Sequence, residues 1–151
     1  MAAADGPLGP LFELAAADGL GIKVGVLAGA MHTDEKGRTV PVAEYAMANE
    51  YGTRRIPSRA AFRSTADARM GEWEDLLVTR LWDGLNPRDA LAQTGGRMVE
   101  DFREAIDQWR NPPNAPATIA RKRSKQDNPL VDSGDLVDAV DFALTGPGES
   151  A

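Results

Sequence analysis

The chain has 151 residues, of which 42% are hydrophobic and 26% charged, so it is long enough for one globular domain with one modest core. Its formal charge of −6 and pI near 4.8 argue against a dedicated duplex-DNA binder, which needs clustered cations to neutralise phosphates. It contains no cysteine, which excludes disulfide scaffolds, thiolate zinc sites and cysteine nucleophiles. The N-terminus lacks the features of a signal peptide, and no run approaches the roughly 20 apolar residues of a membrane span. We therefore expect a cytoplasmic product that does not contact a membrane.

The first part of the chain is expected to hold an arm, a strand and a hairpin. Residues 1–20 are expected to form the arm, with a short helix over 8–18 that a Gly-Leu-Gly stretch ends. Alternating large and small side chains then predict a strand over 21–29. Residues 31–39 are polar and lack periodicity, so we expect a loop, or the tip of a hairpin that returns through 39–42.

Two helices are expected next. Pro41 at a first helical position and Gly52 at a left-handed position beyond the end predict a short helix between them. Ser58 is expected to cap a long helix, because apolar residues follow it at spacings of three and four. This stripe consists of Phe62, Ala66, Met70, Trp73, Leu77 and Leu81.

Asn86 and Pro87 repeat the pattern of a cap followed by a first-turn proline, and they predict a second long helix. Because only a short link precedes them, the two long helices are expected to fold back on each other. Gly95 lies on the apolar face of the second helix, where the missing side chain would let an aromatic residue such as Trp73 approach closely. The alternative is that Gly95 and Gly96 are a tolerated pair without a packing role.

The last part of the chain is more polar. Residues 114–128 are polar and basic and are not expected to bury a core, and residues 132–136 are expected to form a turn or a single helical turn. Alternation of Val140, Phe142 and Leu144 with smaller or charged residues predicts a final strand.

The order of these elements does not alternate as repeating βαβ units would. The predicted fold class is therefore α+β, with a small antiparallel β-sheet packed against a long two-helix hairpin. One domain is expected over residues 21–145, followed by a loose tail over 146–151.

The sequence offers little for catalysis. His32, Asp34 and Glu35 could be written as a metal site, but a solvated loop explains them better, and we expect neither a metal nor another cofactor. Ser133 lacks the Gly-x-Ser-x-Gly context of a nucleophile elbow and is interpreted as a cap or turn residue. We therefore expect that the chain is not an enzyme.

A basic cluster, Arg121-Lys122-Arg123-Ser124-Lys125, is the feature best suited to contact nucleic acid, and Arg54 and Arg55 would extend it. The favoured alternative is a solvated or protein-docking loop, because the chain is acidic and no aromatic residue interrupts the cluster. A nucleic-acid-binding accessory protein using these basic loops remains the second hypothesis for function.

Two segments resemble a known family. The first runs from Val42-Ala43-Glu44-Tyr45 through Asn49-Glu50-Tyr51-Gly52-Thr53 to Ile56-Pro57-Ser58-Arg59-Ala60-Ala61-Phe62. The second runs from Ala115-Pro116-Ala117-Thr118-Ile119-Ala120-Arg121-Lys122 to Pro129-Leu130-Val131-Asp132-Ser133-Gly134-Asp135-Leu136. In order and spacing they resemble small neck and tail-completion proteins of long-tailed bacteriophages, including head-tail joining and tail terminator-like proteins. The chain departs from the usual pattern at Ala60-Ala61, where a proline often precedes the phenylalanine, and at Ser133, where threonine is usual.

The resemblance implies a non-enzymatic virion protein at the head-tail junction. Its copies would form a ring, with six copies expected, that completes or terminates the tail tube and docks it to connector and neck proteins. Genome DNA would pass through the lumen without specific binding, and assembly would take place in the host cytoplasm. The residues expected at interfaces are Glu50, Tyr51, Arg54, Arg55, Arg59, Arg121, Lys122, Arg123 and Asp132.

Overall fold

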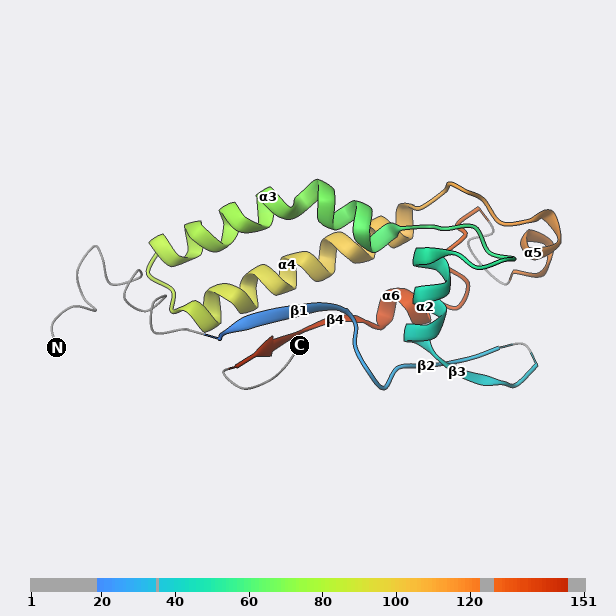
Figure 1. The fold of residues 1–151 in the computed structure, drawn as a ribbon, viewed down its shortest axis with the longest axis horizontal. Helices are drawn as coiled ribbons and strands as arrows, with labels where there is room; N and C mark the ends of the chain where they lie inside the picture. The colour runs from blue at the N-terminus through green and yellow to red at the C-terminus, as the bar shows by residue number, and fades with distance from the viewer. Residues whose placement is uncertain (1–18, 35, 123–126, 147–151) are drawn as a thin grey trace, which may run out of the picture.

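The computed structural model describes residues 19–34, 36–122 and 127–146. Two long helices lie side by side, a two-stranded ribbon lies along one of them, and the shorter elements gather at one end of the molecule (Figure 1). The elements are β1 (Gly21–Val26), β2 (Met31–Thr33), β3 (Thr39–Pro41), α2 (Val42–Tyr51), α3 (Ala61–Trp82), α4 (Pro87–Gln108), α5 (Pro116–Arg121), α6 (Asp135–Asp138) and β4 (Val140–Thr145). The predicted α+β class, with its helical hairpin, is confirmed. The expected helix over 8–18 and the tail beyond 146 lie outside the described residues.

The helical hairpin forms because a polar link separates two apolar stripes. Asn86 caps α4 as expected, since its side chain accepts a hydrogen bond from the backbone N–H of Asp89 at 3.0 Å. Between the helices, the ring of Phe102 lies 5.4 Å from that of Trp73 and 5.1 Å from that of Phe62, measured between centroids. These tilted aromatic contacts form the centre of the core and hold the two helices together.

The buried indole of Trp73 needs a polar partner, and Asp101 of α4 supplies it. Trp73 Nε1 donates to Asp101 Oδ2 at 2.7 Å, and Arg97 Nη2 lies 3.1 Å from Asp101 Oδ1. The carboxylate therefore satisfies the indole while a neighbouring cation balances its charge.

The ribbon of β1 and β4 is antiparallel and covers α4. Its register pairs Ile22 with Leu144, Val24 with Phe142 and Val26 with Val140. Because side chains alternate across a strand, these apolar residues share one face of the ribbon, and that face lies against α4. The predicted strand over 21–29 was too long, since β1 ends at Val26.

Gly95 lies where α4 packs closely against the ribbon. A Cβ atom placed there would lie 2.7 Å from Cδ2 of Phe142 and would also contact Ile22. The prediction of a close aromatic contact at Gly95 is therefore confirmed, but the partner is Phe142 and not Trp73. Gly96 has no such neighbour, because a Cβ there meets no other atom within 4 Å.

The hairpin alternative for residues 31–42 is confirmed, since Met31–Thr33 pairs with Thr39–Pro41. The predicted cap of α3 was wrong. Helix α3 begins at Ala61 and has no side-chain cap from Ser58, whose hydroxyl donates instead to the carbonyl of Glu50 at 2.7 Å. The stretch over 114–128 contains α5, which we did not predict, and ends in the fully buried Asn128; none of its described residues belongs to the buried hydrophobic core, as expected.

Candidate interface

Glu50 lies at the end of α2, and its carboxylate caps the start of α3. Oε2 accepts a hydrogen bond from the backbone N–H of Phe62 at 3.0 Å, and Oε1 accepts one from that of Arg63 at 2.8 Å. The first N–H groups of a helix have no partner within it, and negative charge is favourable at this end. Glu50 is 7% exposed. It therefore fixes the angle between α2 and α3, and it lies inside the subunit instead of on the expected outer patch.

Arg59 joins the start of α3 to the loop that follows α4. Its Nε donates to the carbonyl of Pro112 at 2.9 Å, Nη2 donates to that of Pro113 at 3.0 Å, and Nη1 donates to Asn49 Oδ1 at 3.2 Å. The side chain is buried, and burial lowers the pKa of the guanidinium below its ordinary value. A planar guanidinium suits several acceptors in fixed directions. Arg59, like Glu50, is thus used inside the subunit.

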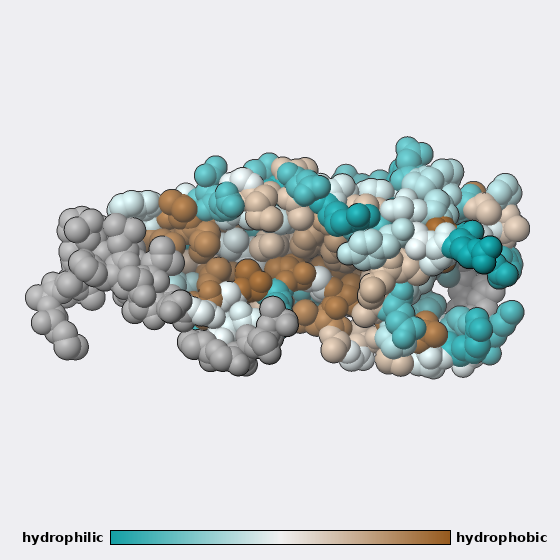
Figure 2. Space-filling view, in the orientation of Figure 1, coloured by the Kyte–Doolittle hydropathy of each residue, from teal (hydrophilic) through white to brown (hydrophobic). Residues whose placement is uncertain are grey.

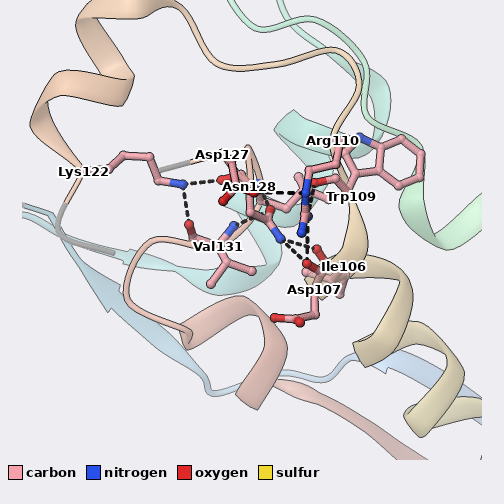
Figure 3. Close-up of polar contacts among 9 residues, drawn as sticks. Ile106, Asp107, Trp109, Arg110, Lys122, Asp127, Asn128 and Val131 are labelled. Atoms are coloured by element: carbon pink, nitrogen blue, oxygen red, sulfur yellow. Dashed lines mark hydrogen bonds and ion pairs between the residues drawn. The ribbon is translucent and has the colours of Figure 1, made fainter. Parts of the chain in front are cut away.

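Asn128 joins the second family-like segment to the end of α4 through buried hydrogen bonds. Its Nδ2 donates to the carbonyls of Ile106 and Asp107 at 2.9 and 2.6 Å, at the end of α4. Its Oδ1 accepts from the backbone N–H groups of Leu130 and Val131 at 2.8 and 3.1 Å (Figure 3). The side chain is fully buried and uses both of its donors and its acceptor oxygen. It therefore holds the segment over 128–131 against the end of α4.

Lys122 ties α5 to the same segment. Its ammonium group donates to the carbonyls of Asn128 and Val131 (Figure 3). Burial lowers the pKa of this ammonium group, while the nearby carboxylates of Asp132 and Asp127 act in the opposite direction. Lys122 is therefore half-buried and engaged inside the subunit.

The other predicted interface residues lie closer to solvent. Tyr51 is 63% exposed, and the guanidinium carbon of Arg63 lies 4.8 Å from the centre of its ring. Arg54, Arg55 and Arg121 are exposed, and Asp132 is half-buried. Arg123 lies outside the described residues. An interface role for the exposed residues stays a prediction.

A mixed-charge cleft of about 280 Å³ lies between the β2–β3 hairpin and α5. It brings Arg121 and Lys122 together with Lys36 and Arg38 of the hairpin. Asp34 partly neutralises this cluster, because its Oδ2 lies 2.7 Å from Nη2 of Arg38. The sequence interpretation missed Lys36 and Arg38, although two cations at a hairpin tip were the available signal.

His32 does not join Asp34 as the rejected metal hypothesis would require. Its Nδ1 lies 2.6 Å from Asp135 Oδ2, and the Ser133 hydroxyl donates to the same oxygen at 2.6 Å. Hydrogen bonds from His32 and Ser133 lower the pKa of the Asp135 carboxyl. Ser133 is thus a turn residue, as expected, and its hydroxyl bonds to the Asp135 carboxylate. Within residues 19–34, 36–122 and 127–146, no three histidine or acidic side chains gather as metal ligands, and Glu35 lies outside these ranges.

Several large apolar side chains are exposed and were not predicted as interface residues. They are Met31, Met47, Met70, Val78 and Trp82, with exposed fractions from 48% to 62%. Figure 2 shows apolar surface over the C-terminal part of α3 and along α4 and β1. The sequence interpretation placed Met70 on the core stripe of α3, which its exposure contradicts, whereas Val78 and Trp82 fall outside that stripe and were not singled out.

No protein-family model, curated protein or solved structure matches this chain. Among the helices of the described residues, none combines the length and apolar character needed to cross a membrane.

Proposed function

We propose that this chain is a structural, non-enzymatic virion protein at the head-tail junction of a long-tailed bacteriophage. Copies form a ring, expected to have six members, that completes or terminates the tail tube and docks it to the connector. The proposal begins from the resemblance of two segments to neck and tail-completion proteins.

One observation carries the proposal further than the resemblance alone. Polar residues of both segments bond to backbone groups at helix ends and loops: Glu50 to the start of α3, and Asn128 to the end of α4. Arg59 of the first segment also binds the loop that leads from α4 toward the second. The two segments therefore form one rigid frame around one end of the hairpin, as a protein that must present fixed docking surfaces requires.

The charge of the chain also suits this role. A net charge of −6 disfavours nonspecific retention of DNA, which is useful in a channel through which a genome must slide. In this proposal Tyr51, Arg54, Arg55 and Arg121 contact neighbouring virion proteins, because they are exposed next to the rigid frame.

Inactivating the gene for this chain in the bacteriophage that the proposal implies tests the function. We expect filled heads and complete but separate tails in electron micrographs, and we expect the wild-type gene supplied in trans to restore joined particles. Normally joined particles without the chain would contradict the proposal.

The second candidate is a nucleic-acid-binding accessory protein, which the cluster of Lys36, Arg38, Arg121 and Lys122 in the cleft favours. This candidate predicts retention on DNA at physiological salt, with an affinity that falls steeply as salt rises. Passage through a DNA column at about 0.15 M salt without retention would exclude it in favour of the first.

A further inference from the structure

The mixed-charge cleft between the β2–β3 hairpin and α5 concentrates positive charge on an acidic chain. Four basic and two acidic side chains line it, a local excess of two positive charges with His32 neutral. The basic residues are Lys36 and Arg38 of the hairpin and Arg121 and Lys122 at the end of α5, and the acidic ones are Asp34 and Asp132. Because the whole chain carries −6, the residues outside the cleft carry −8. The fold therefore brings like charges from two distant segments together, and an anion between them would offset their repulsion.

The carboxylate of Asp34 is already used inside the hairpin. Its Oδ1 accepts hydrogen bonds from the backbone N–H groups of Lys36 and Arg38, each at 2.9 Å. Its Oδ2 accepts one from Nε of Arg38 at 2.7 Å. Asp34 thus fixes the backbone of the hairpin tip and balances the charge of Arg38.

Asp132 acts in the same way on Lys122. Burial lowers the pKa of the Lys122 ammonium group, and the negative charge of Asp132 opposes this shift. The ammonium group also donates to the carbonyls of Asn128 and Val131. Since each carboxylate of the cleft balances one cation, the excess charge belongs to Lys36 and Arg121.

Lys36 and Arg121 are both exposed, and neither forms an ion pair with another residue that the structure describes. Nε of Arg121 donates to the carbonyl of Ala117 at 3.1 Å, which orients the guanidinium and leaves its two terminal nitrogens for a ligand. Thr118 lines the same cleft and adds a hydroxyl group. An ammonium, a guanidinium and a hydroxyl around one cleft form a set of donors that suits an oxyanion.

Charge and size indicate which oxyanion fits. A phosphate monoester carries about −1.5 to −2 at pH 7, which matches the excess of two positive charges. A carboxylate carries a single negative charge, as does each phosphate of a nucleic-acid backbone, so either would leave part of the excess unbalanced. At about 30 Å³ for each water molecule, a cleft of about 280 Å³ has room for roughly nine, which is ample for a tetrahedral phosphate and part of the group that bears it.

We propose that the mixed-charge cleft binds the doubly charged phosphate group of a phosphate monoester. Lys36 Nζ and the terminal nitrogens of Arg121 bind the phosphate oxygens from opposite sides of the cleft, while Arg38 and Lys122 add to its positive potential. The site goes beyond the proposed structural function and does not depend on the ring.

Inorganic phosphate is the probe, and thermal unfolding of the full chain is the measurement. A ligand that binds only the folded chain raises the unfolding midpoint, and the rise with concentration gives its affinity. At about pH 8, where phosphate is mainly doubly charged, we expect phosphate to raise the midpoint more than sodium chloride of equal ionic strength.

Two variants test the residues. Lys36→Gln and Arg121→Gln each remove one charged donor from an exposed side chain, so both should fold normally. Each should weaken phosphate binding at least about tenfold, because a hydrogen bond to a charged group is lost. Arg88→Gln, at an exposed arginine of α4 outside the cleft, is the matched control and should bind phosphate like the wild type.

Two results would overturn the inference. The first is phosphate that stabilises the wild type no more than chloride does, or that stabilises both cleft variants as strongly as the wild type. The second is a DNA oligonucleotide without terminal phosphates that binds more tightly than inorganic phosphate and loses affinity in the same two variants. That second result would favour the nucleic-acid-binding candidate, because such an oligonucleotide offers only phosphodiesters.

Discussion

Three buried polar side chains, those of Glu50, Arg59 and Asn128, hold the end of the helical hairpin together. Each binds backbone groups that the helices and loops cannot satisfy by themselves. Removing such a partner leaves buried donors or acceptors unpaired, which costs more than the net value of the hydrogen bond. At the residue scale, these three polar residues of the family-like segments therefore contribute to the stability of the fold.

The cap formed by Glu50 makes a direct prediction. Glu50→Ala should lower the free energy of unfolding by about 2 kcal/mol, because two backbone N–H groups at the start of α3 lose their acceptor. Glu50→Gln keeps one acceptor oxygen and should cost about half as much. Urea unfolding measures both. Glu44→Ala, exposed on the same helix, should change stability by less than about 0.5 kcal/mol, and an equal loss at Glu44 and Glu50 would contradict the capping role.

The bonds of Asp135 predict a dependence on pH. Its pKa is lower in the folded chain than in the unfolded one, so the carboxylate contributes stability above its unfolded pKa and loses it as pH falls through its folded pKa. Wild type should be more stable than Asp135→Asn at pH 6, and the difference should shrink steadily in more acidic buffer. Urea unfolding over this range measures it, and a difference independent of pH would count against the proposed cause.

At the scale of elements, packing of α4 against both neighbours depends on two adjacent glycines with different surroundings. Gly95 faces Phe142 of β4, whereas Gly96 lines an open cleft between α3 and α4. Periodicity and cap signals in the sequence were sufficient to predict α3, α4, β1 and β4. They were not sufficient for β2 and α5, because such short elements depend on contacts with distant residues, including the bonds of Lys122 next to α5.

The two glycines should respond in opposite directions to the same change. Gly95→Ala should destabilise the chain by about 1–3 kcal/mol, because the new methyl group overlaps Phe142 and Ile22. Gly96→Ala should stabilise it by up to about 1 kcal/mol, because alanine favours the helix and the space is open. Thermal unfolding of both variants provides the comparison. Similar shifts in both would show that the ribbon does not approach α4 at Gly95.

At the scale of the whole molecule, the subunit has a rigid frame at one end of a long helical hairpin. The sequence identified the segments that build the frame but assigned Glu50 and Arg59 to the surface, because residue types alone do not show which charges are buried. It also placed Met70 on the core stripe of α3, although Met70 is 48% exposed, and it did not single out the exposed Val78 and Trp82. Tyr51, Arg54, Arg55 and Arg121 are exposed, and their role at interfaces stays a prediction.

The central claim is that identical copies of this chain close into a ring, and the native mass of the purified wild-type chain tests it most directly. Light scattering over a range of concentration and salt should give one discrete multiple of 16.1 kDa, with six copies expected. A mass that stays at 16.1 kDa at every concentration and salt, or one that grows without limit, would contradict the claim.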